Sequence, residues 1–255
     1  MTTLRPDEVL LLLARPEQLL AGDSRERIGA LLSPRDREHA ERFRSERDRD
    51  VALASRATQR MALSIAANHE IRPVQWRFAT GAGGRPLLES PPAAWGGLRF
   101  SAANTVGLVG CAVSLGREVG LDVERRCDVL PAELVERCLS DREQAELLAL
   151  AERERPDRFT RLWTAKEAYL KARGLGIVQP LDQVEIAFGA NESLALTIGT
   201  ELGDDGEAWR LDCLQPTADH FAAVCVERRD IREAVLITQR WLRLCDERSS
   251  DARAG

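Results

Sequence analysis

The hydrophobic and polar positions along the chain follow two periods, and together they predict a mixture of helices and strands. Apolar residues three or four positions apart indicate amphipathic helices, whereas short apolar runs and strict alternation indicate strands. The two halves share a coarse order, helices and then a hairpin, which is compatible with two related lobes, and residues 232–244 fit neither period clearly. Helices are expected over residues 34–44, 48–68, 131–138, 140–154 and 159–173, and strands over 9–13, 74–78, 98–103, 106–115, 119–124, 184–188, 194–198, 209–214 and 221–226.

The helix predicted over residues 159–173 carries charged residues on its apolar side. At about 100° per residue, Lys166 falls in the middle of the side formed by the apolar positions. Glu167 and Lys171 fall about 40° and about 80° from Trp163. These two lysines are the only ones among the 36 lysine and arginine residues. A lysine within an apolar face is costly unless its charge meets a partner. The pattern therefore fits either a functional site or an ordinary helix with a snorkelling lysine and an i,i+4 charge pair.

Two carboxylates share one face of the strand predicted over residues 119–124. The apolar run over 106–115 reaches a turn at 115–118 and the chain then returns, so we predict a hairpin. Because side chains alternate between the two faces of a strand, Asp122 and Glu124 lie on the same face. Neighbouring carboxylates repel each other unless a divalent cation lies between them, and oxygen ligands suit magnesium. The alternative is an ordinary solvent-facing strand surface.

Composition and charge narrow the class of protein. The hydrophobic content of 44% and the charged content of 30% are ordinary for a soluble globular protein, and the net charge of −5 argues against nucleic acid as the main partner. The chain has no long apolar run and no signal-like start, so we expect a cytoplasmic protein without a membrane partner. The six cysteines lack C-x-x-C spacing and lie far from the three histidines, which argues against a structural zinc site and favours reduced thiols.

Two motifs and a turn together resemble the Sfp-type 4′-phosphopantetheinyl transferases. The first motif is Gly-Leu-Asp-Val-Glu at residues 120–124, and the second is Trp-Thr-Ala-Lys-Glu-Ala-Tyr-Leu-Lys at residues 163–171. A Gly-Gly-Arg-Pro turn at residues 83–86 precedes both motifs, and an R-F-x-x-x-x-D pattern covers residues 42–48. The resemblance covers most of the chain, and the two motifs at this separation are highly specific.

The resemblance implies an α+β molecule with the 4′-phosphopantetheinyl transferase fold, in which two similar lobes, related by a pseudo-twofold axis, enclose the active site. Each lobe is expected to pack a small antiparallel sheet on helices. Residues 1–117 would form the N-terminal lobe on the coenzyme A side, and residues 118–245 the C-terminal lobe with the metal and the catalytic helix. Residues 246–255 are expected to form a disordered tail.

The resemblance also implies a reaction. The family moves the 4′-phosphopantetheine arm of coenzyme A onto a serine of an acyl or peptidyl carrier protein and releases 3′,5′-ADP. Such an attack on a pyrophosphate needs charge neutralisation, positioning and proton removal. Asp122, Glu124 and Glu167 would hold Mg²⁺, and Glu167 would also accept the serine proton. Lys171 and Lys166 would stabilise the phosphate oxygens, with pairing to an acid as the alternative role of Lys166.

The coenzyme A side departs from the family pattern at four positions, one of which is Ala52, at the helix position that can contact the nucleotide end. Asn104 replaces a histidine that contacts phosphate, Ala103 replaces a serine, and Arg85 replaces a lysine in the glycine-rich turn, where glycines let the backbone approach a ligand. None of these departures affects the metal ligands or the base. Arg85 and nearby arginines such as Arg44 and Arg49 would restore the positive charge. The expected coenzyme A contacts are Gly84, Arg85, Pro86, Ala103, Asn104, Arg49 and Lys171.

A basic and apolar segment directly after the metal strand is the expected docking site for the carrier protein. Arg125, Arg126 and Leu130 would supply charge and an apolar anchor near the reacting phosphorus. In the alternative, the two arginines pair with Asp128 and Glu133.

The sequence thus predicts a monomeric, magnesium-dependent transferase that acts on carrier proteins of fatty-acid, polyketide or nonribosomal peptide synthesis. Two other functions stay open. The first is a non-catalytic homologue that binds carrier proteins or coenzyme A, and the intact carboxylate set argues against it. The second is an unrelated magnesium phosphotransferase, which the lack of a P-loop or kinase loop disfavours.

Overall fold

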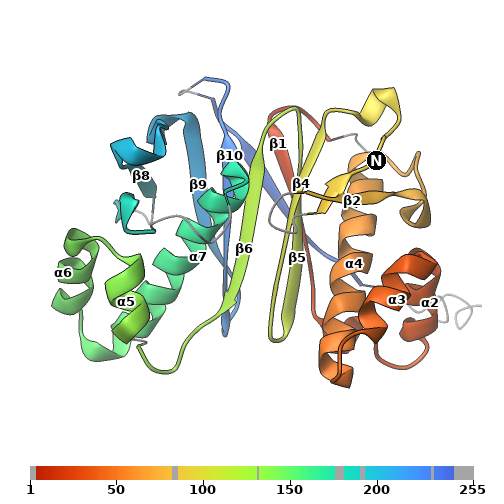
Figure 1. Cartoon of the computed structure of the whole chain (residues 1–255), viewed down its shortest axis with the longest axis horizontal. Coiled ribbons are helices and arrows are strands. Elements are labelled where there is room, and N and C mark those ends of the chain that lie inside the picture. The colour runs from red at the N-terminus through yellow and green to blue at the C-terminus, as the bar shows by residue number, and fades with distance from the viewer. Residues whose placement is uncertain are drawn as a thin grey trace, which may run out of the picture.

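The molecule has four layers, in which two small sheets face each other and helices cover the outer face of each sheet (Figure 1). The computed structural model describes residues 4–81, 86–130, 132–175, 181–189, 193–230 and 233–243. This arrangement of two lobes, each with a sheet packed on helices, confirms the predicted α+β fold class.

The first lobe packs helices on a four-stranded sheet. β1 (Glu8–Ala14), β5 (Leu108–Leu115) and β4 (Leu98–Thr105) are antiparallel neighbours. β11 (Leu236–Trp241) pairs with β1 in parallel, so this sheet is mixed and not purely antiparallel. α4 (Glu46–Ala66) covers the outer face of the sheet (Figure 1). Around these elements lie α1 (Pro16–Leu19), α2 (Ser24–Leu31), α3 (Pro34–Glu41) and the hairpin of β2 (Phe78–Thr80) and β3 (Pro86–Leu88).

The second lobe packs one long helix on a three-stranded antiparallel sheet. The strand order is β6 (Val119–Arg125), β10 (His220–Glu227) and β9 (Trp209–Thr217). α7 (Arg155–Arg173) crosses the outer face of this sheet (Figure 1). The lobe is completed by α5 (Ala132–Cys138), α6 (Asp141–Ala149) and the hairpin of β7 (Val184–Phe188) and β8 (Leu194–Ile198).

Several helix ends follow signals that are readable in the sequence. Ser33 caps α3 by accepting a hydrogen bond from the backbone N–H of Asp36, and Ser140 caps α6 in the same way. α7 ends at Gly174, whose φ of 67° lies in the left-handed region that glycine adopts readily. Among the described residues, no helix combines the length and the apolar character that crossing a membrane would require.

The apolar core between the two sheets determines which way β6 faces. Leu121 and Val123 are buried in this core together with apolar side chains of β1 and β10. Asp122 and Glu124 point the other way and contact side chains of α7. The predicted alternation along this strand is therefore confirmed, but the carboxylate face lies under a helix and not in open solvent.

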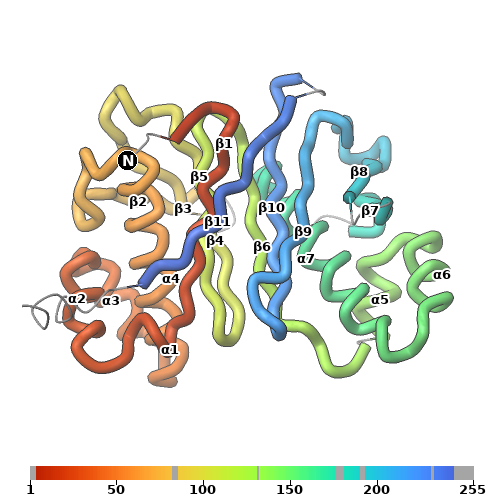
Figure 2. The backbone as a smooth tube through the Cα atoms, turned by 180° about the vertical axis from the view of Figure 1, so that it is seen from behind, coloured from red at the N-terminus to blue at the C-terminus, as the bar shows by residue number. Residues whose placement is uncertain are grey.

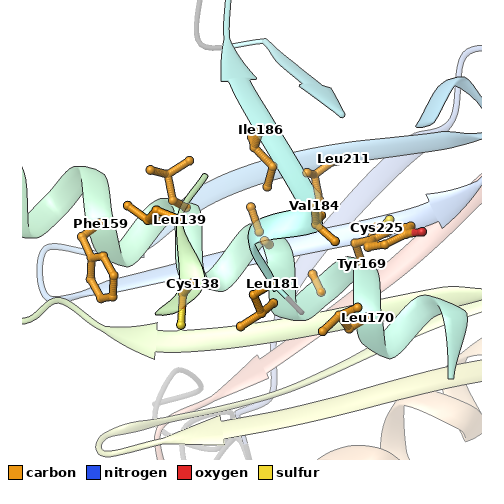
Figure 3. Packing of buried hydrophobic residues seen from close by; sticks show 14 of the residues in the cluster. Cys138, Leu139, Phe159, Tyr169, Leu170, Leu181, Val184, Ile186, Leu211 and Cys225 are labelled. Carbon is orange, nitrogen blue, oxygen red and sulfur yellow. The ribbon is translucent and has the colours of Figure 1, made fainter. Parts of the chain in front are cut away.

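α7 approaches β6 closely because residue 120 is a glycine. A Cβ atom on Gly120 would lie 1.9 Å from the carbonyl oxygen of Ala168 and 2.4 Å from the amide nitrogen of Ala172. Tyr169 and Leu170 of the same helix are fully buried in the core of this lobe (Figure 3). Close contact on one side and a packed apolar core on the other hold the helix in one position on the sheet.

The predicted hairpin of residues 106–115 and 119–124 is wrong. β5 pairs with β1 and β4 in the first sheet, whereas β6 pairs with β10 in the second. The turn between them is the point where the chain passes from one lobe to the other. Both strands are buried on both faces, so their apolar pattern does not distinguish a hairpin partner from a strand of a facing sheet.

The last strand returns from the second lobe to the first. β11 follows the strands of the second lobe in sequence but runs beside β1 (Figure 2). The predicted C-terminal lobe, residues 118–245, thus contains one strand that belongs to the sheet of the N-terminal lobe. This strand is a half-exposed sheet edge, which explains the absence of a clear pattern over residues 232–244. The predicted tail, residues 246–255, lies outside the described residues.

The strand predicted over residues 74–78 is also wrong. Residues Pro73–Gln75 form a 3-10 helix, and β2 begins at Phe78. The buried guanidinium of Arg60 donates hydrogen bonds to the carbonyl oxygens of Pro73 (2.8 Å) and Trp76 (2.7 Å). These bonds from α4 take the place of a strand partner, a contact that local periodicity does not encode.

Candidate active site

The two sequence motifs meet where α7 crosses β6. Lys171 Nζ lies 2.6 Å from Asp122 Oδ1. Glu167, one helical turn before Lys171, also faces this strand, and Asp122 and Lys171 are the charged groups that act on it. Asp122 and Glu167 are 4% and 5% exposed, so the predicted carboxylates of both motifs share one buried position. The alternative of a solvent-facing strand surface does not describe Asp122.

Two buried carboxylate oxygens at this position lack a hydrogen-bond partner among the residues that the structure describes. They are Asp122 Oδ2 and Glu167 Oε1. Burial raises the pKa of both carboxyl groups, and the ammonium of Lys171 opposes that rise. Buried carboxylate oxygens are normally hydrogen-bonded or bound to a cation. These two oxygens therefore indicate that a cation or a hydrogen-bond donor binds here.

Glu124 lies nearer the end of β6 and forms, with Asp122 and Glu167, what we call the carboxylate cluster. Its Oε1 accepts a hydrogen bond from Trp163 Nε1 at 3.3 Å, and Thr105 Oγ1 lies 3.5 Å from its Oε2. Burial, followed by the negative charge of Asp122, raises the pKa of Glu124 to about 7. Sequence analysis missed Thr105 and treated Trp163 only as an apolar residue. The signal available was the position of Thr105 directly after Asn104.

The chemistry of these residues fits a hard divalent cation. Asp122, Glu124 and Glu167 offer only oxygen atoms, which magnesium prefers, and two of those oxygens have no hydrogen-bond partner in the described ranges. In the described part of the structure, no three histidine, cysteine, aspartate or glutamate side chains are arranged closely enough to hold a metal ion together. The positive charge against Asp122 is instead supplied by Lys171.

Lys166 is placed away from the carboxylate cluster. Its side chain is fully buried, and its Nζ donates hydrogen bonds to the carbonyl oxygens of Cys138 (2.7 Å) and Leu181 (3.0 Å) and to Glu143 Oε2. The other carboxylate oxygen of Glu143 accepts the backbone N–H of Ile186 at 2.9 Å. The arrangement matches the alternative role for Lys166, in which it pairs with an acid and holds the helix in place.

Apart from Lys171, the predicted coenzyme A contacts that the structure describes lie in the first lobe. Gly84 and Arg85 lie outside the described residues, and Pro86 begins β3. Ala103 is buried and Asn104 is exposed near the end of β4, next to the threonine that approaches Glu124. Arg49 is half-buried near the start of α4, where its Nη1 donates hydrogen bonds to two backbone carbonyl oxygens. The remaining member of the set, Lys171, lies in the second lobe, where its Nζ is 2.6 Å from Asp122 Oδ1.

A histidine that the sequence analysis left unassigned joins the two lobes beside this site. His220 Nε2 lies 2.8 Å from the carbonyl oxygen of Val106, in the turn between β4 and β5. Its Nδ1 lies 2.7 Å from Thr217 Oγ1. His220 pairs with Arg125 across the second sheet. This contact holds the β4–β5 hairpin against β10, the neighbour of the strand that carries the carboxylates.

The segment after β6 differs from its prediction. Arg126 forms a two-point ion pair with Asp157 of α7 (2.9 and 2.8 Å), and not with Asp128 or Glu133. Leu130 is partly buried against the core of the second lobe. The exposed apolar residue is Val129, which is 79% exposed. The exposed residues here are therefore Arg125, which is the last residue of β6, and Asp128 and Val129, which follow it.

Comparisons with known proteins support the same family as the two motifs. The family model described as "4'-phosphopantetheinyl transferase superfamily" matches residues 118–225, which include both motifs. The chain is 33% identical over 228 residues to the 4′-phosphopantetheinyl transferase HetI of a Nostoc species, covering 88% of this chain and 90% of HetI. It is 26% identical over 216 residues to the 4′-phosphopantetheinyl transferase Sfp of Bacillus subtilis, covering 85% of this chain and 91% of Sfp.

Among solved structures, the holo-[acyl-carrier-protein] synthase of Thermotoga maritima aligns with a TM-score of 0.37 and 21% identity, over 44% of this chain and 64% of that chain. The relationship therefore rests on the sequence comparisons, which extend over both lobes. With the Gly-Leu-Asp-Val-Glu strand and the Lys-Glu helix in contact and this extent of similarity, the chain belongs to the Sfp-type family of 4′-phosphopantetheinyl transferases.

Proposed function

We propose that this protein transfers the 4′-phosphopantetheine arm of coenzyme A to a serine of an acyl or peptidyl carrier protein and releases 3′,5′-ADP. The observation that carries the proposal is the contact between the two motifs, in which Asp122 and Glu124 of β6 face Glu167 and Lys171 of α7. The transferase relatives cover most of the chain, so the similarity is not confined to one motif.

In this proposal the serine Oγ attacks the phosphorus that carries the pantetheine arm, and the bond from that phosphorus to the 3′,5′-ADP oxygen breaks. Glu167 accepts the proton of the serine. Burial raises the pKa of Glu167 in the metal-free protein, and a positioned carboxylate within reach of the serine hydroxyl can act as a general base. Lys171 offers its ammonium to the phosphate oxygens, where negative charge increases as 3′,5′-ADP leaves.

Asp122, Glu124 and Glu167 would hold Mg²⁺. When bound, the cation neutralises the pyrophosphate oxygens and orients them. Trp163 and Thr105 orient the carboxylate of Glu124 toward the cluster through its two oxygens. Lys166 has a structural role in this proposal, because its ion pair with Glu143 holds α7 in the register that presents Glu167.

The remaining assignments are also proposals. The lobe of residues 1–117 would contact coenzyme A through Gly84, Arg85, Pro86, Ala103, Asn104 and Arg49. One chain contains both lobes and all the proposed site residues, which supports a monomer. The protein would act in the cytoplasm on carriers of fatty-acid, polyketide or nonribosomal peptide synthesis.

Incubation with coenzyme A, Mg²⁺ and a panel of apo-carrier proteins tests the function directly. We expect the mass of at least one carrier to increase by one phosphopantetheine group, and the increase to disappear when EDTA removes the metal. A protein that binds carriers or coenzyme A without changing any carrier's mass would instead be the non-catalytic homologue. A different phosphotransferase would leave every carrier unchanged and show no binding to coenzyme A.

The exposed segment after β6 makes a prediction about carrier docking. Removing Arg125 and Val129 together, as Arg125→Ala with Val129→Ser, is expected to raise the carrier KM about tenfold, because a steering charge and an apolar contact are both lost. The dependence of KM on salt should also become flatter. Steady-state kinetics with the carrier, together with calorimetry for coenzyme A, measure both effects.

The matched control for this prediction lies on α6. Arg142 and Leu148 are also exposed, and Arg142→Ala with Leu148→Ser removes the same kinds of group elsewhere on the second lobe. We expect this control to leave the carrier KM unchanged. If the affinity for coenzyme A collapses in the first variant while the carrier KM does not move, the segment binds the nucleotide and the carrier docks elsewhere.

A further inference from the structure

Lys171 occupies the position where the carboxylate cluster needs positive charge. Its Nζ lies 2.6 Å from Asp122 Oδ1, and it also opposes the rise in pKa of Glu124 and Glu167. The other basic side chains at this level of α7 face different partners, since Lys166 bonds to Glu143 and Arg173 bonds to Asp204. In this structure, one ammonium thus acts on all three carboxylates.

The ammonium group of Lys171 would also repel a divalent cation that binds to these carboxylates. Asp122 Oδ2 and Glu167 Oε1 are the oxygens that lack a partner within the described part of the chain, so a cation held by Asp122 would share that carboxylate with Lys171. A double and a single positive charge at such short range repel each other strongly in a buried site. The side chain of Lys171 is 33% exposed, whereas that of Asp122 is only 6% exposed, so the lysine is the partner that has room to move.

We propose that Lys171 is a built-in competitor of the divalent cation, and that it couples cation binding to coenzyme A binding. This inference rests on the proposed function for the identity of the second ligand. Without substrate, Lys171 neutralises the cluster and weakens cation binding. The phosphates of coenzyme A offer Lys171 another anionic partner, so they draw it from Asp122 and make room for the cation. By thermodynamic linkage, the cation then strengthens coenzyme A binding by the same factor.

The coupling need not pass through Lys171 alone, because a bound cation also contacts phosphate directly. The part that belongs to Lys171 is isolated by removing its charge. Lys171→Met keeps most of the aliphatic side chain but has no ammonium to compete with a cation. We expect this variant to bind the cation more tightly than the wild type when no coenzyme A is present, and to gain less from added coenzyme A.

Calorimetric titration of the full-length protein with Mg²⁺ or Mn²⁺, without any carrier protein, tests the proposal independently of transfer activity. Lys171→Met should bind the cation about tenfold more tightly than wild type in the absence of coenzyme A. Saturating coenzyme A should increase the cation affinity of both proteins. The increase should be about tenfold smaller in Lys171→Met than in wild type. Lys171→Arg keeps the charge and should stay close to wild type.

Arg142→Met is the matched control, because it removes one positive charge from an exposed side chain of α6. It should leave cation affinity unchanged, which separates local competition from a change in net charge. Circular dichroism and Tm verify folding, and Lys171→Gln replaces Lys171→Met if the latter does not fold.

The inference would be overturned if Lys171→Met or Lys171→Gln bound the cation with the same affinity as wild type. If wild type modifies carriers in the same experiments, the proposed function stays intact. A wild-type protein that neither binds the cation nor modifies any carrier would instead overturn the proposed function, and the inference with it. Tighter binding in Lys171→Met but also in Arg142→Met would reduce the effect to net charge and would likewise overturn the role of Lys171.

Discussion

Replacing Asp122 with asparagine is expected to reduce transfer activity about a thousandfold or more while the protein stays folded. Asparagine keeps the shape of the side chain but supplies no negative charge for a cation. The expected loss corresponds to about 4 kcal/mol of transition-state stabilisation, which is in the range that metal-ion catalysis supplies. Steady-state kinetics with coenzyme A and an apo-carrier protein that the wild type modifies measures this loss.

The stability of the same variant separates a functional carboxylate from a structural one. Burial raises the pKa of Asp122, so the folded state holds its proton to a higher pH than the unfolded chain does. The stability that this group supports is therefore lost as the pH rises from the unfolded pKa through the folded pKa. Asparagine has no proton to lose, and Lys171 is exposed enough to be solvated without its partner. The Tm of metal-free Asp122→Asn at pH 7 should equal or exceed that of wild type.

Added Mg²⁺ provides the second measurement. A ligand that binds only the folded state raises Tm, so wild type should be stabilised by Mg²⁺ and Asp122→Asn should not. Full activity in the variant would remove Asp122 from the metal site. A large fall in Tm in metal-free buffer would mean that the carboxylate mainly supports the fold.

Replacing Gly120 with alanine is expected to destabilise the protein by about 3 kcal/mol or more, and the variant is expected to be largely unfolded at 37 °C. The added Cβ would lie 1.9 Å from the backbone oxygen of Ala168 and 2.4 Å from the backbone nitrogen of Ala172. Backbone atoms cannot rotate away as a flexible side chain would, so β6 and α7 must separate. Chemical denaturation monitored by tryptophan fluorescence measures the change.

Gly29 provides the matched control for this substitution. It lies within α2, and a Cβ atom there would meet nothing within 4 Å. Gly29→Ala should therefore stabilise the protein by about 0.5–1 kcal/mol, because alanine is the better residue in a helix. A small effect of Gly120→Ala, comparable in size to that of Gly29→Ala, would show that α7 is not held against β6 at this position.

Gly120 also explains the spacing of the first motif. Glycine, aspartate and glutamate occupy alternate positions of β6, so all three face α7. The glycine lets the helix come close at Ala168 and Ala172, which directly follow Glu167 and Lys171. One small residue in the strand thus brings the helix residues within reach of the carboxylates.

Features carried by local periodicity were predictable from the sequence. The alternation along residues 119–124 put Asp122 and Glu124 on one face, and the helical period placed Lys166 on the buried side of its helix, as the structure has them. The two motifs were sufficient to predict the family. Period and spacing are properties of consecutive residues, so no knowledge of distant partners was needed.

Only the tertiary structure decided which elements pair and what each charge contacts. The sequence predicted a hairpin where β5 and β6 lie in different sheets, and it contained no sign that β11 returns to β1. It also left open whether Lys166 meets phosphate or Glu143. The physical reason is the same in each case. Periodicity determines which face of an element is buried, but the partner on that face depends on residues far along the chain, whose competing contacts are resolved only when the whole core packs.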